Sequence, residues 1–183
     1  MMKKVNKVIK DPVMGLAFFS RFIFTILFFP FRMLMYKHIG FLTYISMRSA
    51  VRNHSRISIG NHSQINPFVT LWPLDLQIGH HTQVNPGTAI YGKVSIGNHV
   101  MIAPNCMLAG GSHNYDDTVQ YMMYQHSKEK GITIEDDVWI GANSTILDGV
   151  TIGKGAIVGA NSIFKDVAGY SIAVTPKRSK RKA

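Results

Sequence analysis

The chain has 183 residues, a formal net charge of +10 at pH 7 and one cysteine. This length fits a single domain with appendages. A lone cysteine excludes an intramolecular disulfide and fits a reducing compartment. The positive charge lies at the ends: residues 1–56 hold ten Lys or Arg and one acid, residues 177–183 hold five more basic residues, and residues 57–176 hold five basic and nine acidic ones. Because the body has no basic surplus, the composition argues against a nucleic-acid-binding domain, and the basic ends suit anionic lipid or a phosphorylated ligand.

The N-terminal part contains an apolar run at residues 13–31, VMGLAFFSRFIFTILFFPF, which reaches the lower length range of a membrane span. Arg21 near its middle costs roughly 2.5–3.5 kcal/mol on insertion scales, and Pro30 can kink or end a helix. Both flanks are basic, which favours a cytoplasmic side for both. We therefore expect residues 1–56 to be a basic, apolar helical segment that lies in the membrane interface or re-enters it. Packing on the fold or in an oligomer interface is the alternative, and a cleaved signal peptide is not expected because no small-x-small site follows.

A six-residue repeat follows, in which Ile or Val stands at place one and Ser, Thr, Val, Ala or Cys at place five. The units begin at Ile59, Ile65, Ile78, Val84, Ile90, Ile96 and Ile102, and again at Ile134, Ile140, Ile146, Ile152 and Val158. Six residues make a short strand and its corner, so three units make a coil of about eighteen residues. The sequence predicts a parallel β-helix of roughly four to five coils over residues 57–170. Places one and five, including Cys106, fill its interior, and Gly or Asn at place two provides the dihedral angles of tight corners.

This pattern resembles the hexapeptide-repeat acyltransferases, and most of all the sugar O-acetyltransferases such as those for maltose and galactosides. The resemblance implies an all-β fold, a left-handed parallel β-helix, with an N-terminal apolar helical segment. It also implies acetyl-CoA as the acyl donor and a homotrimer with sites between neighbouring β-helices. Transfer would be direct, without an acyl-enzyme.

The repeat is interrupted at residues 109–132, AGGSHNYDDTVQYMMYQHSKEKGI, and a loop of this length in a tight repeat is usually functional or disordered. In the family, a histidine in an H-x-x-D setting at this point is the catalytic base, which here is His113. A histidine suits the task because it is neutral near pH 7 and can accept the hydroxyl proton. Asp116 is the candidate that orients the ring, and holding the loop together is its alternative role.

The second run, VWIGANSTILDGVTIGKGAIVGANS, carries the strongest motif match, and in the family it lines the acetyl-CoA groove. Amides near Gly141 would bind the pantetheine arm or act as an oxyanion hole. Small residues in these places also serve corners and core, so the binding role rests on the resemblance. The predicted CoA-binding residues of this run are Trp139, Gly141, Ala142, Gly159 and Ala160.

The C-terminal end departs from the family pattern where the nucleotide end of CoA usually binds. Lys165 lies in a segment one residue shorter than usual, and Lys177 follows a segment without the usual Gly-Asn. Both remain candidate phosphate contacts, and the basic tail at residues 171–183 can replace them. Asn85 is a candidate for binding the acceptor sugar, although Asn-Pro is also ordinary turn chemistry.

The sequence therefore predicts an acetyl-CoA-dependent O-acetyltransferase for a sugar of a surface polysaccharide or lipid-linked glycan. We expect it on the inner face of the bacterial cytoplasmic membrane. The alternatives are N-acetylation of a nucleotide-linked amino sugar and a non-catalytic β-helix scaffold. Zinc chemistry of the γ-carbonic-anhydrase type, which uses the same fold, is not expected, because the eight histidines lack that signature.

Overall fold

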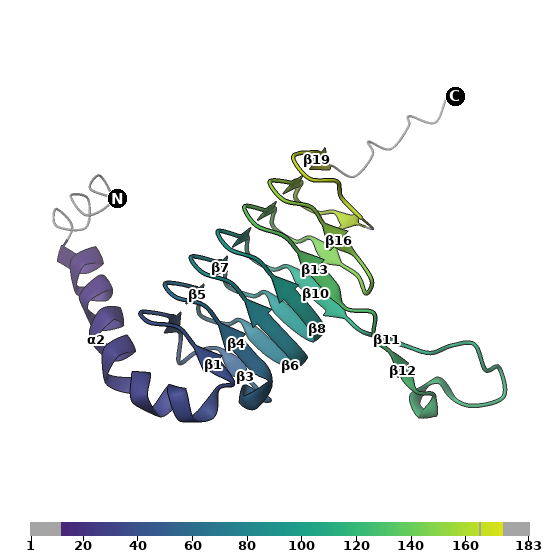
Figure 1. Ribbon diagram of the computed structural model, residues 1–183, viewed down its shortest axis with the longest axis horizontal. Coiled ribbons are helices and arrows are strands. Elements are labelled where there is room, and N and C mark those ends of the chain that lie inside the picture. The colour runs from purple at the N-terminus through teal and green to yellow at the C-terminus, as the bar shows by residue number, and fades with distance from the viewer. Residues whose placement is uncertain (1–11, 165, 174–183) are drawn as a thin grey trace.

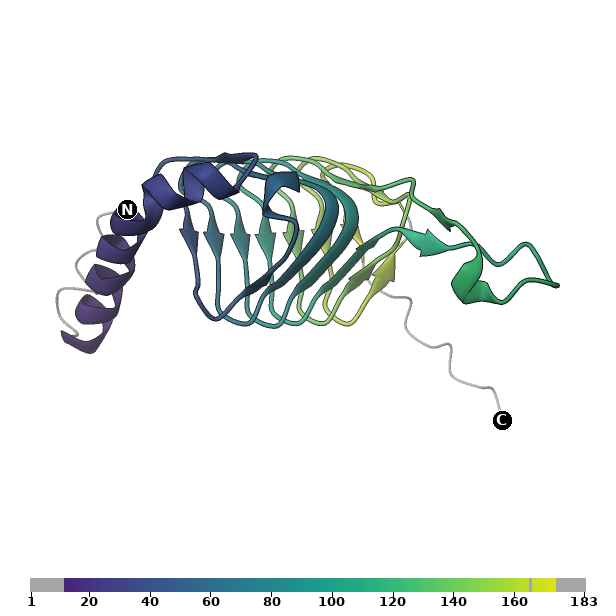
Figure 2. The same cartoon turned by 90° about the horizontal axis from the view of Figure 1, so that it is seen from below.

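The computed structural model describes residues 12–164 and 166–173, which form a long helix followed by a stack of coils (Figures 1 and 2). All pairings between strands of successive coils are parallel, and place one stacks on place one along the stack. The pairing of residues 70–78 with residues 89–96 has one register shift, between Pro73 and Asp75. The predicted mostly-β parallel β-helix with an N-terminal helix is confirmed.

The helix α2 spans Pro12–Met35 and continues through Pro30. Among the described residues, one sheet has seven strands: β2 (Tyr44–Ile45), β5 (Gln64–Ile65), β7 (Gln83–Val84), β9 (Met101–Ile102), β14 (Trp139–Ile140), β17 (Ile157–Val158) and β19 (Ile172–Ala173). A second sheet has ten: β1 (His38–Ile39), β3 (Ala50–Val51), β4 (Ile57–Ile59), β6 (Thr70–Ile78), β8 (Ala89–Ile96), β10 (Met107–Gly110), β13 (Ile132–Ile134), β15 (Thr145–Ile146), β16 (Thr151–Ile152) and β18 (Ile163–Phe164). A hairpin joins β11 (Ser112–His113) and β12 (Ser127–Lys128), and short 3-10 helices span η1 (His54–Arg56) and η2 (Met122–Tyr124).

The β-helix is longer than predicted and begins earlier. The seven-stranded sheet takes one strand from each coil, so the described residues form seven coils instead of roughly four to five. The first coil starts at β1, which pairs with β4, and continues through β2 and β3. Its strands lie inside residues 1–56, which the sequence had assigned to the helical segment. That boundary therefore needs correction to about residue 38.

The interior is a column of aliphatic side chains supplied by place one. Ile65, Val84, Ile102, Ile140 and Val158 are almost completely buried and stack in register from coil to coil. Place five fills the space beside them, and Cys106 is buried there as predicted. Continuous burial of this kind is the main stabilising term of a repeat fold, in which each coil contacts only its neighbours.

Glycine at place two has a different cause from the predicted one. Gly60 and Gly79 have ordinary φ angles, but a Cβ on Gly79 would lie 2.6 Å from the carbonyl carbon and oxygen of Gly97 in the next coil. Place two is thus the point of closest approach between coils. The left-handed conformation instead falls at place four, as in His62 (φ 58°) and Asn105 (φ 60°). Asn and Gly tolerate this region best.

Helix α2 lies against the first coil through its two arginines. The buried Arg32 donates from Nη2 to the Ile45 carbonyl oxygen at 2.8 Å, and the Arg21 guanidinium lies 5.0 Å from the centre of the Tyr44 ring. Because both of its cations face the coil, the outward face of the described helix is apolar. The exposed residues on it include Leu16, Phe19, Phe22, Ile23, Ile26, Leu27, Phe31 and Leu34. In the part of the chain that the structure describes, no helix combines the length and hydropathy required of a membrane span.

Candidate active site

The interruption of the repeat is a hairpin that projects from the middle of the stack (Figure 2). The chain leaves the coil after β10, forms β11, and returns through β12, whose Ser127 pairs with His113. Gln125 is buried at the base of the loop, where its Nε2 donates to the carbonyl oxygens of Asp117 (2.7 Å) and Gln120 (2.9 Å). The segment 109–132 is therefore an ordered arm that places His113 at the edge of the coils.

His113 lines a surface hollow of about 280 Å³ between this arm and the coils. We call it the His113 hollow. Its coil side is made by Trp72, Leu74 and Tyr91, and its arm side by Ser112, His113, Ser127 and Glu129. The hollow combines aromatic walls with a titratable side chain, which is the usual composition of a small-molecule site.

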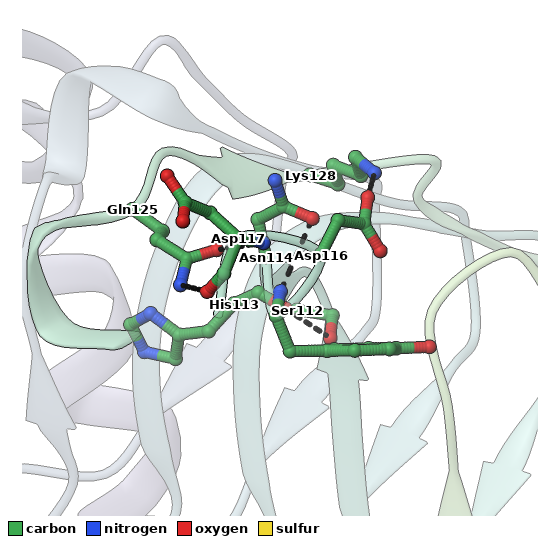
Figure 3. Close-up of polar contacts among 8 residues, drawn as sticks. Ser112, His113, Asn114, Asp116, Asp117, Gln125 and Lys128 are labelled. Atoms are coloured by element: carbon green, nitrogen blue, oxygen red, sulfur yellow. Dashed lines mark hydrogen bonds and ion pairs between the residues drawn. The ribbon is translucent and has the colours of Figure 1, made fainter. Parts of the chain in front are cut away.

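Asp116 does not contact His113. Its carboxylate accepts a hydrogen bond from the Lys128 ammonium, which ties the start of the loop to β12. Figure 3 shows the His113 ring pointing away from Asp116. The structure thus supports the loop-holding alternative for Asp116, and the predicted role in orienting His113 gains no support from this geometry.

One chain does not bring His113 together with the predicted amide donors. Strands β10 and β15 pair side by side, with Met107 opposite Thr145. Ala142 precedes β15, whereas His113 follows β10, so the two lie at opposite ends of the same face. From the paired Met107 and Thr145, His113 lies six residues further along the chain and Ala142 three residues back, so the two are displaced in opposite directions. Ala142 is not among the residues that line the hollow with His113.

The Gly141 amide is not available as a donor, because its N–H bonds to the Val158 carbonyl oxygen at 2.8 Å in the coil ladder. The next amide along the chain differs. Among the hydrogen bonds of the described residues there is none from the Ala142 N–H, and the residue stacked beyond it, Ala160, has no side-chain acceptor. Of this pair, only Ala142 keeps a donor for a ligand.

A comparison of place three along the stack explains this difference. In the units that begin at Ile59 and Ile78, the place-three amides donate to side chains of the next coil. Asn61 N–H donates to His80 Nδ1 (2.9 Å), and His80 N–H donates to Asn98 Oδ1 (2.8 Å). At the corner of Ala142, place three in the three preceding coils is Pro67, Pro86 and Pro104. The fold therefore does not use the N–H at this position.

The remaining predicted residues are spread along the stack. Trp139 is half exposed on the seven-stranded sheet, opposite Met101 and Ile157. Gly159 follows one coil after Gly141, and its N–H bonds to the Ala173 carbonyl oxygen at 2.7 Å. These placements leave the groove assignment of Trp139, Gly159 and Ala160 as a prediction. Lys165 and Lys177 lie outside the described residues.

Asn85 is held inside the coil ladder. Its Nδ2 donates to the Ile102 carbonyl oxygen at 2.8 Å, and its Oδ1 accepts from Asn66 Nδ2 at 3.2 Å. Both polar ends of the half-buried side chain are thus used by the fold. This favours the turn role of Asn85 over the acceptor-binding role.

Three histidines stack along one corner. The rings of His62, His81 and His99 are nearly parallel, with centroids 5.0 Å apart in each successive pair. Desolvation lowers the pKa of His81 below its ordinary value, and the neighbouring His62 and His99 lower it further. Parallel rings do not converge on a common point, so this stack lacks the geometry of a zinc site.

The chain is similar to a family of bacterial transferases and to several known acyltransferases. The model of the bacterial transferase hexapeptide (six repeats) family matches residues 75–110 and 131–166. The galactoside O-acetyltransferase of Lactococcus lactis is 34% identical over 108 residues, 52% of this chain and 51% of that protein. The chain thus spans about half the length of the curated relatives it matches.

Two solved structures are similar over most of the chain. A mutant of the N-acyltransferase AntD from Bacillus cereus, in complex with dTDP-4-amino-4,6-dideoxyglucose and coenzyme A, has a TM-score of 0.72 at 26% identity and covers 84% of this chain and 87% of that one. A hexapeptide-repeat-containing acetyltransferase from Vibrio cholerae, complexed with acetyl coenzyme A, has a TM-score of 0.55 at 28% identity, with coverage of 84% and 74%.

Proposed function

Because the chain belongs to the hexapeptide-repeat acetyltransferase family, we propose that it transfers an acetyl group from acetyl-CoA to a sugar hydroxyl of a surface polysaccharide or lipid-linked glycan. The observation that carries the proposal is the exposed His113 at the mouth of a hollow, on an arm that interrupts matched family repeats. The galactoside O-acetyltransferase relative supports a hydroxyl acceptor.

In the proposed reaction, His113 accepts the proton of the attacking hydroxyl while its oxygen bonds to the thioester carbonyl carbon. The tetrahedral intermediate then collapses, the carbon–sulfur bond breaks, and the protonated His113 returns the proton to the departing thiolate. Transfer is direct. Cys106 is buried inside the coil, and burial raises the pKa of its thiol, so it is a poor nucleophile.

We propose that the acyl donor lies between two copies of the chain. It is supported by the placement of the two residues in one protomer, where Ala142 precedes β15, His113 follows β10 and Ala142 does not line the His113 hollow. A homotrimer that sets the Ala142 face of one copy beside the His113 arm of the next would supply the base and the free amide to one donor. Lys165 and Lys177 stay candidate contacts for the phosphates of CoA on the basis of the sequence.

N-acetylation of a nucleotide-linked amino sugar is the second candidate function. It is favoured by the similarity to AntD, an N-acyltransferase that covers this chain over most of its length. The product separates the two: mild alkali releases an O-acetyl ester but leaves an N-acetyl amide. Incubation with acetyl-CoA and both acceptor types, followed by mass spectrometry before and after alkali, decides between them. If no CoA thiol is released from acetyl-CoA with either acceptor type, both transfer reactions are ruled out and the non-catalytic scaffold is favoured.

The free amide gives a direct test of the donor site. Ala142→Pro removes one N–H at a position where three preceding coils already carry proline, so the fold should be retained. Loss of one neutral hydrogen bond of about 0.5–1.5 kcal/mol should weaken CoA binding roughly 2- to 12-fold in isothermal titration calorimetry.

The matched control is Ala142→Ser, which keeps the N–H and adds a small polar group. Its CoA affinity should stay close to that of the wild type, and both variants should melt near the wild-type temperature. Equal affinity of the Pro variant and the wild type would rule out this amide as a contact.

We also propose that helix α2 holds the protein at the inner face of the cytoplasmic membrane. Two observations support this location. The helix turns Arg21 and Arg32 toward the first coil and leaves an apolar face exposed. Lys3, Lys4, Lys7 and Lys10 precede it in the sequence and suit anionic head groups.

Vesicle flotation tests the membrane proposal. The full chain should float with vesicles of phosphatidylcholine and phosphatidylglycerol, and less with phosphatidylcholine alone. Leu27→Asp with Leu34→Asp should reduce partitioning at least about 100-fold, because two leucines leave the apolar face. Val119→Asp, at an exposed apolar site on the hairpin arm, is the control. A wild-type chain that stays unbound in both lipid mixtures would overturn the proposal.

A further inference from the structure

A row of stacked side chains leads into the His113 hollow. Val51 pairs with Leu71, and Trp72 pairs with Tyr91, so Arg52, Trp72 and Tyr91 occupy equivalent places on three successive coils. The Arg52 guanidinium carbon lies 4.3 Å from the centre of the Trp72 ring, and the centres of Trp72 and Tyr91 are 6.2 Å apart. We call these three residues the aromatic row.

The aromatic row ends where the hollow begins. Tyr91 pairs with Ala109 on the next coil, whose small side chain leaves space in front of the arm that carries His113. Trp72 and Tyr91 themselves form the coil wall of the hollow. Trp72 is 47% exposed although it is one of the largest side chains. Exposed aromatic faces next to a general base are suited to hold the flat face of a sugar ring.

The electrostatics of the row favour an anionic group at its far end. The acid on the hollow wall, Glu129, is paired with Lys93 at 3.7 Å. Asp75, on the same strand as Trp72, is paired with Lys37 at 3.5 Å. Arg52 has no ion pair among the described residues. Its guanidinium therefore keeps its donors for an oxyanion, and planar, forked donors match a phosphate group.

We propose that Arg52, Trp72 and Tyr91 form the acceptor subsite, and that it takes a sugar bearing a phosphate or diphosphate group; this rests on the proposed acyl transfer at His113. The sugar ring lies over Tyr91 with its reacting group toward His113, and the phosphate reaches Arg52 past Trp72. From Arg52 to the coil of Ala109 there are three coil steps of about 4.8 Å, roughly 14 Å in all, a span suited to a hexose followed by a diphosphate.

The binding test reads the subsite directly, without catalysis. The chain has two tryptophans, so Trp139→Phe leaves Trp72 as the sole indole reporter. UDP-galactose and galactose 1-phosphate should change the Trp72 emission saturably and more tightly than methyl β-galactoside; galactose is chosen because of the galactoside O-acetyltransferase relative. Arg52→Met keeps the stacking on Trp72 but removes the charge. It should weaken binding of the phosphorylated sugars roughly 10- to 100-fold.

Arg56→Met is the matched control, because Arg56 is an exposed arginine of η1 that is not part of the row. It should leave affinity for the phosphorylated sugars near the wild-type value. Equal losses in the Arg52 and Arg56 variants, or the same affinity for phosphorylated and neutral sugars, would overturn the proposal. For Trp72→Phe and Trp72→Ala, which remove the reporter, binding is measured by isothermal titration calorimetry. Trp72→Phe should retain more affinity for the phosphorylated sugars than Trp72→Ala, with equal melting temperatures for the two variants.

The source of the phosphate is resolved by a second pair of probes. UDP-galactose and a polyprenyl-diphosphate galactose in detergent carry the same diphosphate, and the one that binds more tightly identifies a nucleotide or a lipid carrier. If either probe binds but no thiol is released from acetyl-CoA, the subsite proposal is supported and the proposed transfer reaction is contradicted. If the Arg52 and Trp72 variants transfer acetyl groups at the wild-type rate, the proposed reaction is supported and the subsite proposal is contradicted.

Discussion

His113→Ala should lower kcat for acetyl transfer by about 100- to 10,000-fold while the protein keeps its fold and its affinity for CoA. The reason is that the neighbouring carboxylates are already paired: Asp116 is engaged with Lys128, and Glu129, on the wall of the hollow, is paired with Lys93. Without a base, the hydroxyl must attack while still protonated. The measurement is release of CoA thiol in the presence of a sugar acceptor, with the melting temperature recorded alongside.

His126→Ala provides the control for this substitution. His126 is exposed on the same arm but is not part of the hollow, so its removal should change kcat little. Asp116→Asn should act through the arm and loosen the tie to Lys128, with a smaller effect on kcat than His113→Ala. If the His113 and His126 variants are equally active, the base assignment is wrong.

The repeat itself was readable in the sequence because its cause is local. An aliphatic residue at place one is required wherever a coil stacks on another, and every unit beginning from Ile59 to Val158 obeys this. The first coil was missed although Ile39, Ile45, Val51 and Ile57 follow the same step of six. The neighbouring apolar run masked the signal, since its composition indicated a helix that extended further than Met35.

The site was harder to predict because it depends on contacts between distant segments. The sequence pointed to His113 through the interruption of the repeat, but the partner of Asp116 is Lys128 on the opposite strand of the hairpin. The aromatic row joins Arg52, Trp72 and Tyr91 from three coils. The repeat is broken between the units that begin at Ile65 and Ile78, so the spacing in the sequence does not show that these three residues occupy equivalent places. The strand pairing shows it.

The same contrast applies to place two, where the sequence correctly showed glycine but suggested the wrong reason. Corner dihedrals and close approach both select glycine, and only coordinates separate them. The left-handed φ at His62 and Asn105 assigns the corner to place four, whereas Gly79 packs its Cα against the next coil. This distinction has a large energetic consequence.

Gly79→Ala should be among the most destabilising conservative changes in the chain. The added methyl would lie 2.6 Å from the Gly97 carbonyl group, which belongs to the backbone of a stacked coil and cannot rotate away. Overpacking of this kind costs about 3 kcal/mol at the upper end of its usual range, which would lower the melting temperature by roughly 6–12 °C for a chain of this size. Thermal unfolding followed by circular dichroism measures the shift.

Gly111→Ala is the matched control, because its methyl would meet the Glu129 Cγ, part of a flexible side chain, at 3.1 Å and no backbone atom closer than 4.0 Å. Its melting temperature should stay within about 2 °C of the wild type, since a small clash is offset by the lower entropy of the unfolded chain. Gly79 has an ordinary φ, so an alanine there causes no backbone strain, and without the contact to the next coil Gly79→Ala would be as mild as this control. A large difference between the two variants therefore separates coil contact from backbone strain.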